Sequence, residues 1–245
     1  GIELSNDSQL FLEVCPCPSI GITGSAGKST TTALVGKMAA ASFSMKGQQH
    51  RAWTGGNLGN PLIEVLDQIQ ADDLVVMELS SFQLELMRNS PNIAAILNIT
   101  PNHLDRHHTM AAYTQAKAQI LLHQHQEDLA VLNRDDVGSW ALTENLRSDL
   151  ISFGFSKPEG RANGTYLKDE HIWLQIGREN LKMLPADWVL LRGRHNLANV
   201  LAACAIAAGA SLPLPAIQTA IESFTGVPHR LELVREHNGV TWYND

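Results

Sequence analysis

The chain has little cysteine, no long apolar run and no recognisable signal peptide. Three cysteines stand among 245 residues, at positions 15, 17 and 204. Their odd number and their spacing match no zinc or redox motif, so we expect a reducing, cytoplasmic environment. No apolar stretch approaches the roughly 20 residues that cross a bilayer. The sequence therefore argues against a disulfide-stapled secreted domain and against a membrane-spanning protein.

Basic residues are also too few for a protein that binds polyanions. Lys and Arg together number 18 against 25 Asp and Glu, the net charge is −7, and no long run of Lys or Arg occurs. This balance argues against nucleic-acid and membrane-surface partners. Hydrophobic residues make up 44% of the chain, so a full core can be buried in one large domain or two small ones.

A glycine-rich segment near the start carries the strongest functional signal. Residues 21–31 read Gly-Ile-Thr-Gly-Ser-Ala-Gly-Lys-Ser-Thr-Thr, between a strand expected over 20–24 and a helix expected over 28–41. Glycines let backbone N–H groups close around phosphate oxygens, and a helix N-terminus adds partial positive charge. Lys28 would reach the β- and γ-phosphates, and the Ser29 hydroxyl would bind Mg²⁺. Ile22 stands where the strict motif has its first glycine. We interpret the segment as a nucleoside triphosphate site.

Strands alternate with helices along the chain, which predicts a doubly wound α/β fold with a mostly parallel sheet. Continuous apolar runs at 74–79 and 93–98 are typical of buried parallel strands. Alternating residues over 164–184 predict a small antiparallel patch at the sheet edge, with a turn at 168–170. The other expected elements are strands over 129–133 and 150–153, helices over 10–17, 61–70, 109–126, 195–209 and 214–223, a loop over 54–61, and a hairpin over 231–243 that turns at Asn238-Gly239.

Polar residues end two of these strands, where ligands of open parallel sheets collect. Glu78 ends the run at 74–79, in the position of an acid that holds Mg²⁺. The alternative is a partly buried acid that caps the next helix. His103 follows the run at 93–98, and we expect it beside the glycine-rich segment.

A second histidine raises the question of zinc. His103 and His107 are four residues apart and could share one helix face, but Leu104 replaces the glutamate of the zinc motif. No third ligand follows at a suitable spacing. We therefore favour His103 alone and expect His107 and His108 at the surface.

Five segments together resemble the Mur ligase family. They are 23–29, 55–59, 78–85, 102–106 and 193–199, and they occur in family order over nearly the whole chain. The segment 78–85, Glu-Leu-Ser-Ser-Phe-Gln-Leu-Glu, points to the D-glutamate-adding branch. One departure is Ala26, where the family usually has asparagine; we expect the loop backbone to survive and one side-chain hydrogen bond to be lost.

The resemblance implies a three-domain, ATP-dependent amide ligase of peptidoglycan precursor synthesis. Residues 1–7 would be the tail of a UDP-binding domain, 8–226 the central ATP-binding domain, and 227–245 the start of a truncated C-terminal domain. The resemblance further implies a cytoplasmic monomer that joins D-glutamate to UDP-N-acetylmuramoyl-L-alanine through an acyl phosphate, with a part in cell shape and cell division.

The resemblance also implies roles for single residues. Those expected at ATP are Gly24, Ser25, Ala26, Gly27, Lys28, Ser29, Thr30, Thr31, Asn196, Asn199, Arg230 and Asp245. Those expected at two Mg²⁺ ions are Ser29, Glu78, His103 and Lys117, and the catalytic set is Lys28, Glu78, His103 and Lys117. Asn57 and Ser80 would contact the uridine-nucleotide substrate.

Two of these residues have ordinary alternatives. Lys117 would carry a carbamate in the family, whereas the sequence alone predicts a plain lysine on a helix surface. Asn196 would lie near adenine, whereas it could also cap the helix that begins there.

Two other functions remain open. A folylpolyglutamate-synthetase-type ligase shares the phosphate loop and the carbamate chemistry, and the segment 79–83 argues against it. A non-catalytic ATP-binding module would act through domain closure.

Overall fold

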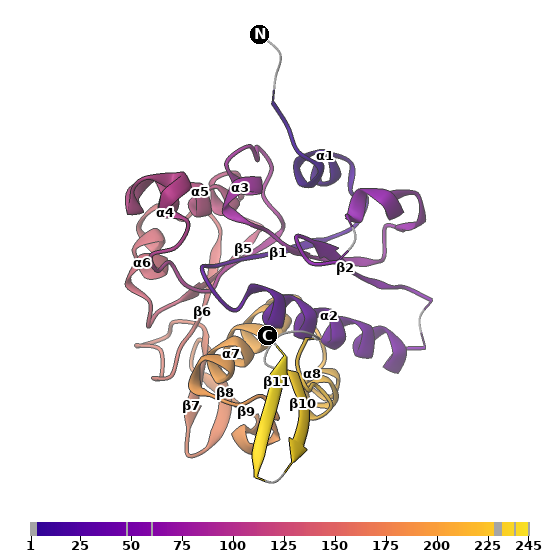
Figure 1. The fold of residues 1–245 in the computed structure, drawn as a ribbon, viewed down its shortest axis with the longest axis vertical. Helices are drawn as coiled ribbons and strands as arrows, with labels where there is room; N and C mark the ends of the chain where they lie inside the picture. The colour runs from indigo at the N-terminus through magenta and orange to yellow at the C-terminus, as the bar shows by residue number, and fades with distance from the viewer. Residues whose placement is uncertain (1–3, 48, 60, 228–231, 238, 245) are drawn as a thin grey trace.

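A nine-stranded sheet forms the centre of the computed structural model, which describes residues 4–47, 49–59, 61–227, 232–237 and 239–244 (Figure 1). The strand order is β2-β3-β1-β4-β5-β6-β7-β8-β9. Strands β1 to β7 pair in parallel, and β8 and β9 add an antiparallel edge. The strands are β1 (Ser19–Thr23), β2 (Ala52–Gly56), β3 (Leu74–Glu78), β4 (Ile93–Ile96), β5 (Leu129–Asn133), β6 (Asp149–Phe153), β7 (Gly164–Lys168), β8 (His171–Ile176) and β9 (Glu179–Pro185). The expected α/β fold and its antiparallel edge are confirmed.

Helices cover both faces of this sheet. Helices α2, α7 and α8 lie on one face, and α1, α3 and α5 lie on the other (Figure 1). The helices are α1 (Asp7–Val14), α2 (Lys28–Met45), α3 (Ser81–Leu84), α4 (Leu104–His107), α5 (Met110–Leu122), α6 (Val137–Trp140), α7 (Arg194–Gly209) and α8 (Leu214–Glu222), with 3₁₀-helices η1 (Leu62–Gln68), η2 (Ala141–Asn145) and η3 (Ala186–Trp188).

Each face of the sheet has its own hydrophobic core. In β3, Val76 packs into the core under α2, whereas Val75 and Met77 pack into the core under α1 and α5. Both faces of the strand are buried, which is why the sequence shows a continuous apolar run rather than alternation. The sheet is therefore held rigidly, and the ends of its parallel strands are fixed relative to one another.

Three local predictions were wrong. The loop expected over 54–61 begins as the edge strand β2, which pairs with β3 from Ala52 to Gly56. The helix expected over 61–70 is the 3₁₀-helix η1. The first helix begins at Asp7 rather than at residue 10, because the Asn6 side chain accepts a hydrogen bond from the Gln9 N–H and caps it.

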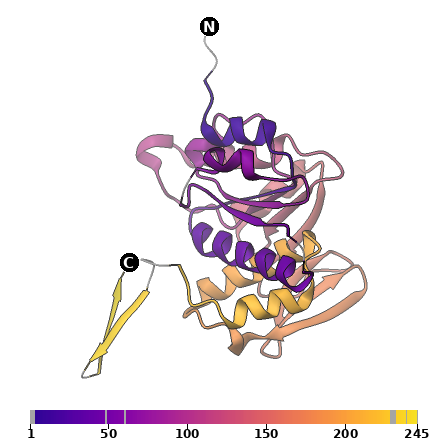
Figure 2. The same ribbon diagram turned by 90° about the vertical axis from the view of Figure 1, so that its right-hand side faces the viewer.

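Two predicted hairpins are confirmed. The turn between β7 and β8 contains Asp169 and Glu170, both at positive φ (49° and 56°), as a two-residue turn of type I′ requires. The second hairpin joins β10 (Glu232–His237) to β11 (Val240–Asn244) in a separate two-stranded sheet, and Figure 2 shows it standing away from the main body. Asn238, expected in its turn, lies outside the described residues.

Within the described residues, no helix combines the length and the apolarity needed to cross a bilayer.

Candidate functional site

The glycine-rich segment connects β1 to α2 at the carboxyl edge of the parallel strands. Gly27 adopts φ +85°, a left-handed conformation that favours glycine, and α2 begins at the next residue, Lys28. The first N–H groups of any helix have no partner within the helix and point at the space before it. Here Gly24 and Gly27 precede these N–H groups and Lys28 is the first residue of the helix, so the segment can receive an anion such as a phosphate.

The end of β4 braces this loop. The Asn98 side chain accepts a hydrogen bond from the Ala26 N–H (2.8 Å) and donates one to the Ala26 carbonyl (3.0 Å). The Ser25 N–H donates to the Asn98 carbonyl (3.0 Å), and the Thr100 N–H donates to the Ser25 hydroxyl (2.9 Å). Asn98 thus fixes the backbone at Ala26. Asn98 was not among the site residues predicted from the sequence.

Helix α7 packs against the other side of the loop. A Cβ atom added to Gly27 would overlap the side-chain oxygen of Asn199, which is buried. The Asn199 amide donates to the Asn196 side-chain oxygen (3.2 Å), and the Asn196 amide donates to the Arg192 carbonyl (2.8 Å). The residue that caps α7 is Gly193, so the capping alternative for Asn196 was wrong. Both asparagines therefore lie in the first turns of α7, next to the start of α2.

Glu78 lies one strand away, at the end of β3. Its side chain is 2% exposed; one carboxylate oxygen accepts a hydrogen bond from the Asn57 amide (3.0 Å). The other oxygen is buried and has no hydrogen-bond partner in the described part of the chain. Glu78 does not cap the next helix, since that role falls to Ser80. An unpaired buried carboxylate oxygen is costly unless a cation or a proton occupies it.

Lys117, on α5, points into the back of the loop. Its side chain is 1% exposed, so the alternative of a plain lysine on the helix surface was wrong. The amine donates to the Gly24 carbonyl (2.9 Å) and to the Thr23 hydroxyl (3.3 Å), and it lies 4.8 Å from the centre of the Tyr113 ring. Lys28 donates to the same Gly24 carbonyl (3.0 Å). Two lysine amines therefore converge on one carbonyl oxygen of the glycine-rich segment.

The environment of Lys117 weakens its hold on a proton. Burial disfavours the charged ammonium, and the positive charge of Lys28 adds to the effect, so the pKa of Lys117 falls from 10.5 to about 7. A large share of this amine is therefore uncharged and nucleophilic near neutral pH.

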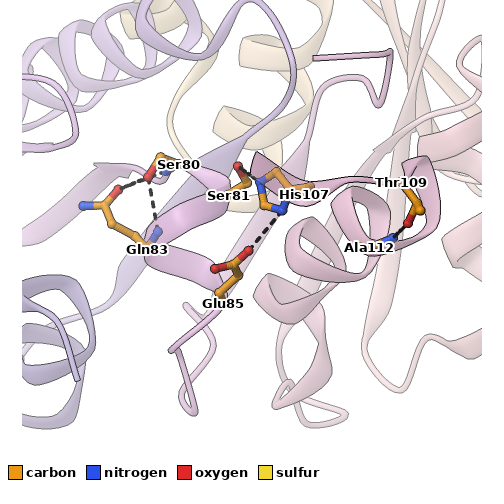
Figure 3. Close-up of polar contacts among 7 residues, drawn as sticks. All are labelled: Ser80, Ser81, Gln83, Glu85, His107, Thr109 and Ala112. Carbon is orange, nitrogen blue, oxygen red and sulfur yellow. Dashed lines mark hydrogen bonds and ion pairs between the residues drawn. The ribbon is translucent and has the colours of Figure 1, made fainter. Parts of the chain in front are cut away.

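Side chains of the segment 80–85 form hydrogen bonds and an ion pair with one another and with neighbouring helices (Figure 3). Ser80 caps α3: its hydroxyl accepts from the Gln83 N–H (3.3 Å) and donates to the Gln83 side-chain oxygen (2.9 Å). The Gln83 amide in turn donates to the Ser8 hydroxyl of α1 (2.9 Å). The glutamine thus connects the residue after β3 to the first helix.

His107 is buried, with 5% of its surface exposed, so the prediction of a surface position was wrong. One ring nitrogen lies 2.9 Å from the Ser81 hydroxyl and the other 3.0 Å from a Glu85 carboxylate oxygen (Figure 3). The ring stacks on Phe82 (centres 5.3 Å apart, planes at 4°) and packs against Tyr113. These partners satisfy both ring nitrogens and explain the burial. His108 is exposed, as predicted.

His103 remains accessible at the same edge of the sheet. It is exposed, has φ +51°, and its ring centre lies 5.3 Å from that of Phe82. A left-handed backbone is uncommon for a residue other than glycine and often accompanies a functional position.

The remaining predicted site residues divide into buried, partly exposed and undescribed ones. Ser29 is buried at 3% exposure and Thr30 is partly exposed, both in the first turn of α2. Thr31 is fully buried, and its N–H donates to the Gly27 carbonyl, so it supports the loop from within the helix. Arg230 and Asp245 lie outside the described residues.

No cluster of three or more His, Cys, Asp or Glu side chains suited to a metal ion occurs in the described part of the chain. Magnesium needs no such cluster, because proteins often bind it through one or two carboxylates together with waters and substrate phosphates. The unpaired oxygen of Glu78 and the hydroxyl of Ser29 are hard oxygen donors of the kind that magnesium prefers.

Comparison with known proteins identifies the family. The model of the Mur ligase middle domain matches residues 22–207, so this chain belongs to the Mur ligase family. The whole chain is 44% identical to UDP-N-acetylmuramoylalanine--D-glutamate ligase of Symbiobacterium thermophilum and 43% identical to the protein of the same name from Legionella pneumophila (strain Lens). It covers 52% and 53% of these relatives, so it spans about half of their length.

Solved structures share the fold. A UDP-N-acetylmuramoyl-L-alanyl-D-glutamate--2,6-diaminopimelate ligase superimposes on 94% of the chain, which covers 51% of that protein, with a TM-score of 0.69 at 22% identity. MurF from Acinetobacter baumannii superimposes on 92% of the chain, which covers 50% of that protein, with a TM-score of 0.64 at 23% identity. At these identities the likeness supports the fold and no finer conclusion.

Proposed function

We propose that this chain is the ATP-binding part of a ligase that joins D-glutamate to UDP-N-acetylmuramoyl-L-alanine in peptidoglycan precursor synthesis. Family membership and relatives that carry this name at up to 44% identity support the proposal. The observation that carries it is the convergence of Lys28 and Lys117 on the Gly24 carbonyl, behind a phosphate-binding loop.

The loop would bind the phosphates of ATP. The N–H groups at the start of α2 would face phosphate oxygens, and Lys28 would turn from the Gly24 carbonyl toward the transferred γ-phosphoryl group. A carboxylate nucleophile and a triphosphate repel each other, so positive charge at this position favours their meeting. The acyl phosphate would form as the substrate carboxylate oxygen attacks phosphorus and the bond to ADP breaks. The amino group of D-glutamate would then displace phosphate.

Magnesium fits the oxygen donors of the loop region. We propose that Ser29 and Glu78 hold one ion; the unpaired buried oxygen of Glu78 supports this role. The ion would neutralise phosphate charge and polarise the phosphorus centre. We further propose that His103 contributes to a second ion together with Lys117.

Lys117 would serve that role as a carbamate. An uncharged amine attacks carbon dioxide, and the product loses a proton and becomes an anion. The pKa of about 7 leaves much of the Lys117 amine uncharged at neutral pH, which supports this chemistry. An anion on Lys117 would also offset the charge of Lys28, which now disfavours a second cation beside it.

Other residues would complete the site. Asn57 and Ser80 would lie toward the uridine nucleotide, and Asn196 and Asn199 toward the adenine. Arg230 and Asp245 would reach ATP from the segment after residue 227, where we propose that a third domain begins. We also propose the first domain boundary near residue 7, a monomeric state and a cytoplasmic location.

The test uses the full-length protein. With ATP and Mg²⁺, ADP release should require both UDP-N-acetylmuramoyl-L-alanine and D-glutamate, and Lys117→Ala should abolish it. The 245-residue chain should bind nucleotide weakly and ligate nothing. If another amino acid replaced D-glutamate as the better substrate, the assignment within the family would be wrong.

The same assay separates the two other functions. A folylpolyglutamate-type ligase would turn over a folate substrate, and a non-catalytic module would bind ATP without forming product. Product formation with D-glutamate excludes both.

A further inference from the structure

Two cysteines are in contact just before β1, at the opposite end of this strand from the glycine-rich segment. Cys15 follows the last residue of α1, and Cys17 lies two residues before β1. Their sulfur atoms are 3.8 Å apart, and both thiols are free. Cys15 is partly exposed, whereas Cys17 is buried at 8% exposure. An accessible sulfur therefore lies directly against a sheltered one.

The contact makes the two thiols chemically different. The contact with the Cys17 thiol, in which either sulfur can be the donor, favours the Cys15 thiolate and lowers the pKa of Cys15 to about 7. The same contact, together with burial and the nearby Asp73 carboxylate, raises the pKa of Cys17. A thiolate that is partly exposed is the form of cysteine that peroxides oxidise.

The linker between the sulfurs is short. Cys15 and Cys17 are separated by Pro16 and followed by Pro18, whose carbonyl accepts a hydrogen bond from the Val75 N–H (3.0 Å), so a bond between the sulfurs requires movement mainly on the Cys15 side. Bringing the sulfurs to bonding distance requires a movement of about 2 Å. The small ring that results would be strained, and strained disulfides are readily reduced by thiols.

We propose that Cys15 and Cys17 form a reversible oxidation site for hydrogen peroxide, with Cys15 as the attacking sulfur and Cys17 as the resolving one. The Cys15 thiolate attacks one peroxide oxygen, the O–O bond breaks, and hydroxide leaves and takes up a proton as water. The Cys15 sulfenic acid is then attacked by the Cys17 sulfur, the S–O bond breaks, and the proton of Cys17 leaves with hydroxide as a second water. Two thiols and one peroxide thus give one disulfide and two waters.

The test maps thiols in the unmodified chain, so it depends on no substitution. The reduced protein is treated with a small excess of hydrogen peroxide, denatured in iodoacetamide and analysed by peptide mass spectrometry. We expect a Cys15–Cys17 disulfide that dithiothreitol reverses, and an alkylated Cys204, which is fully buried and serves as the internal control. If both Cys15 and Cys17 are alkylated after peroxide, or if Cys15 links two chains instead, the proposal is overturned.

Variants assign the order of the steps. In Cys17→Ser, the sulfenic acid of Cys15 should accumulate and react with dimedone, whereas Cys204→Ser should form the disulfide as the unmodified chain does. In Cys15→Ser, Cys17 should stay reduced under the same treatment. Oxidation of Cys17 in Cys15→Ser at the rate of the unmodified chain would refute the assigned order.

Discussion

The buried amine of Lys117 should make the stability of this chain depend on pH in a definite direction. The pKa of Lys117 is about 7 in the folded chain, whereas an ordinary, solvent-exposed lysine has a pKa of 10.5. We take the second value for the unfolded chain, in which Lys117 is exposed to water. Below pH 7 both states hold the proton, and the folded state bears the full cost of a buried ammonium. Between these two pKa values the unfolded state binds more protons, so the free energy of unfolding rises with pH.

The magnitude follows from the size of the shift. Each pKa unit corresponds to about 1.4 kcal/mol, so the shift from 10.5 to about 7 is worth at most about 5 kcal/mol across the whole window. From pH 7 to about pH 9 the expected gain is about 2 kcal/mol, because the amine is still half protonated at the start. Lys117→Met removes the titrating amine, keeps an unbranched apolar stem, and should lose this gain.

The measurement is urea unfolding of the unmodified chain and Lys117→Met at several pH values, in buffers freed of carbon dioxide. The difference in the free energy of unfolding between the two chains isolates Lys117, because other titrating groups are common to both. Lys168→Met, which removes an exposed lysine at the end of β7, controls for the loss of an amine. If the curves of the unmodified chain and Lys117→Met run parallel, the inferred burial cost is wrong. Added bicarbonate should stabilise only chains that retain Lys117, if the carbamate forms.

Three further substitutions test the loop. Gly27→Ala places a side chain at φ +85° and against Asn199, so it should cost at least about 1 kcal/mol in urea unfolding and weaken ATP binding measured by calorimetry. Asn98→Ala removes both hydrogen bonds to Ala26; a loss of about 1–3 kcal/mol and about tenfold weaker ATP binding are expected, and unchanged binding would show that the brace is dispensable. Glu78→Gln replaces the carboxylate whose second oxygen has no hydrogen-bond partner among the residues that the structure describes, so Mg²⁺ should no longer strengthen ATP binding; an unchanged effect of Mg²⁺ would show that Glu78 does not hold the ion.

The strands were predictable where both faces are buried. Continuous apolar runs such as 74–79 and 93–98 predict strands because water is excluded from both sides. The edge strand β2 was missed, since Thr54-Gly55-Gly56 has the composition of a loop. It forms because its backbone pairs with β3, with Ala52 opposite Leu74, and this distant partner is not encoded in the local pattern.

The glycine-rich motif of the candidate site could be predicted from the sequence, but the residues that pack around it could not. The glycines and Lys28 could be recognised by their spacing in the sequence, because a phosphate-binding turn is formed by consecutive residues. The roles of Asn98 and His107 depend on contacts across the fold: Asn98 meets Ala26, and His107 meets Ser81 and Glu85. Lys117 looks like a surface residue in sequence because a lysine in a helix is usually solvated. The family resemblance gave Lys117 a functional role, but its burial is seen only in the structure.

The supports suggest why the loop can bind charge without rearranging. Asn98, which follows β4, hydrogen-bonds to Ala26; Asn199 of α7 packs closely against Gly27; and the Tyr113 phenol of α5 lies 3.0 Å from the Ser25 hydroxyl. A loop held from three elements keeps its N–H groups oriented before any ligand arrives, and such preorganisation lowers the cost of stabilising a transition state. The groups left in unfavourable surroundings, the carboxylate of Glu78 and the amine of Lys117, are those that a cation and carbon dioxide would relieve. If the proposed ion and carbamate form, stability lost at these two residues in the ligand-free chain would be recovered on binding, which would favour the occupied state of the site.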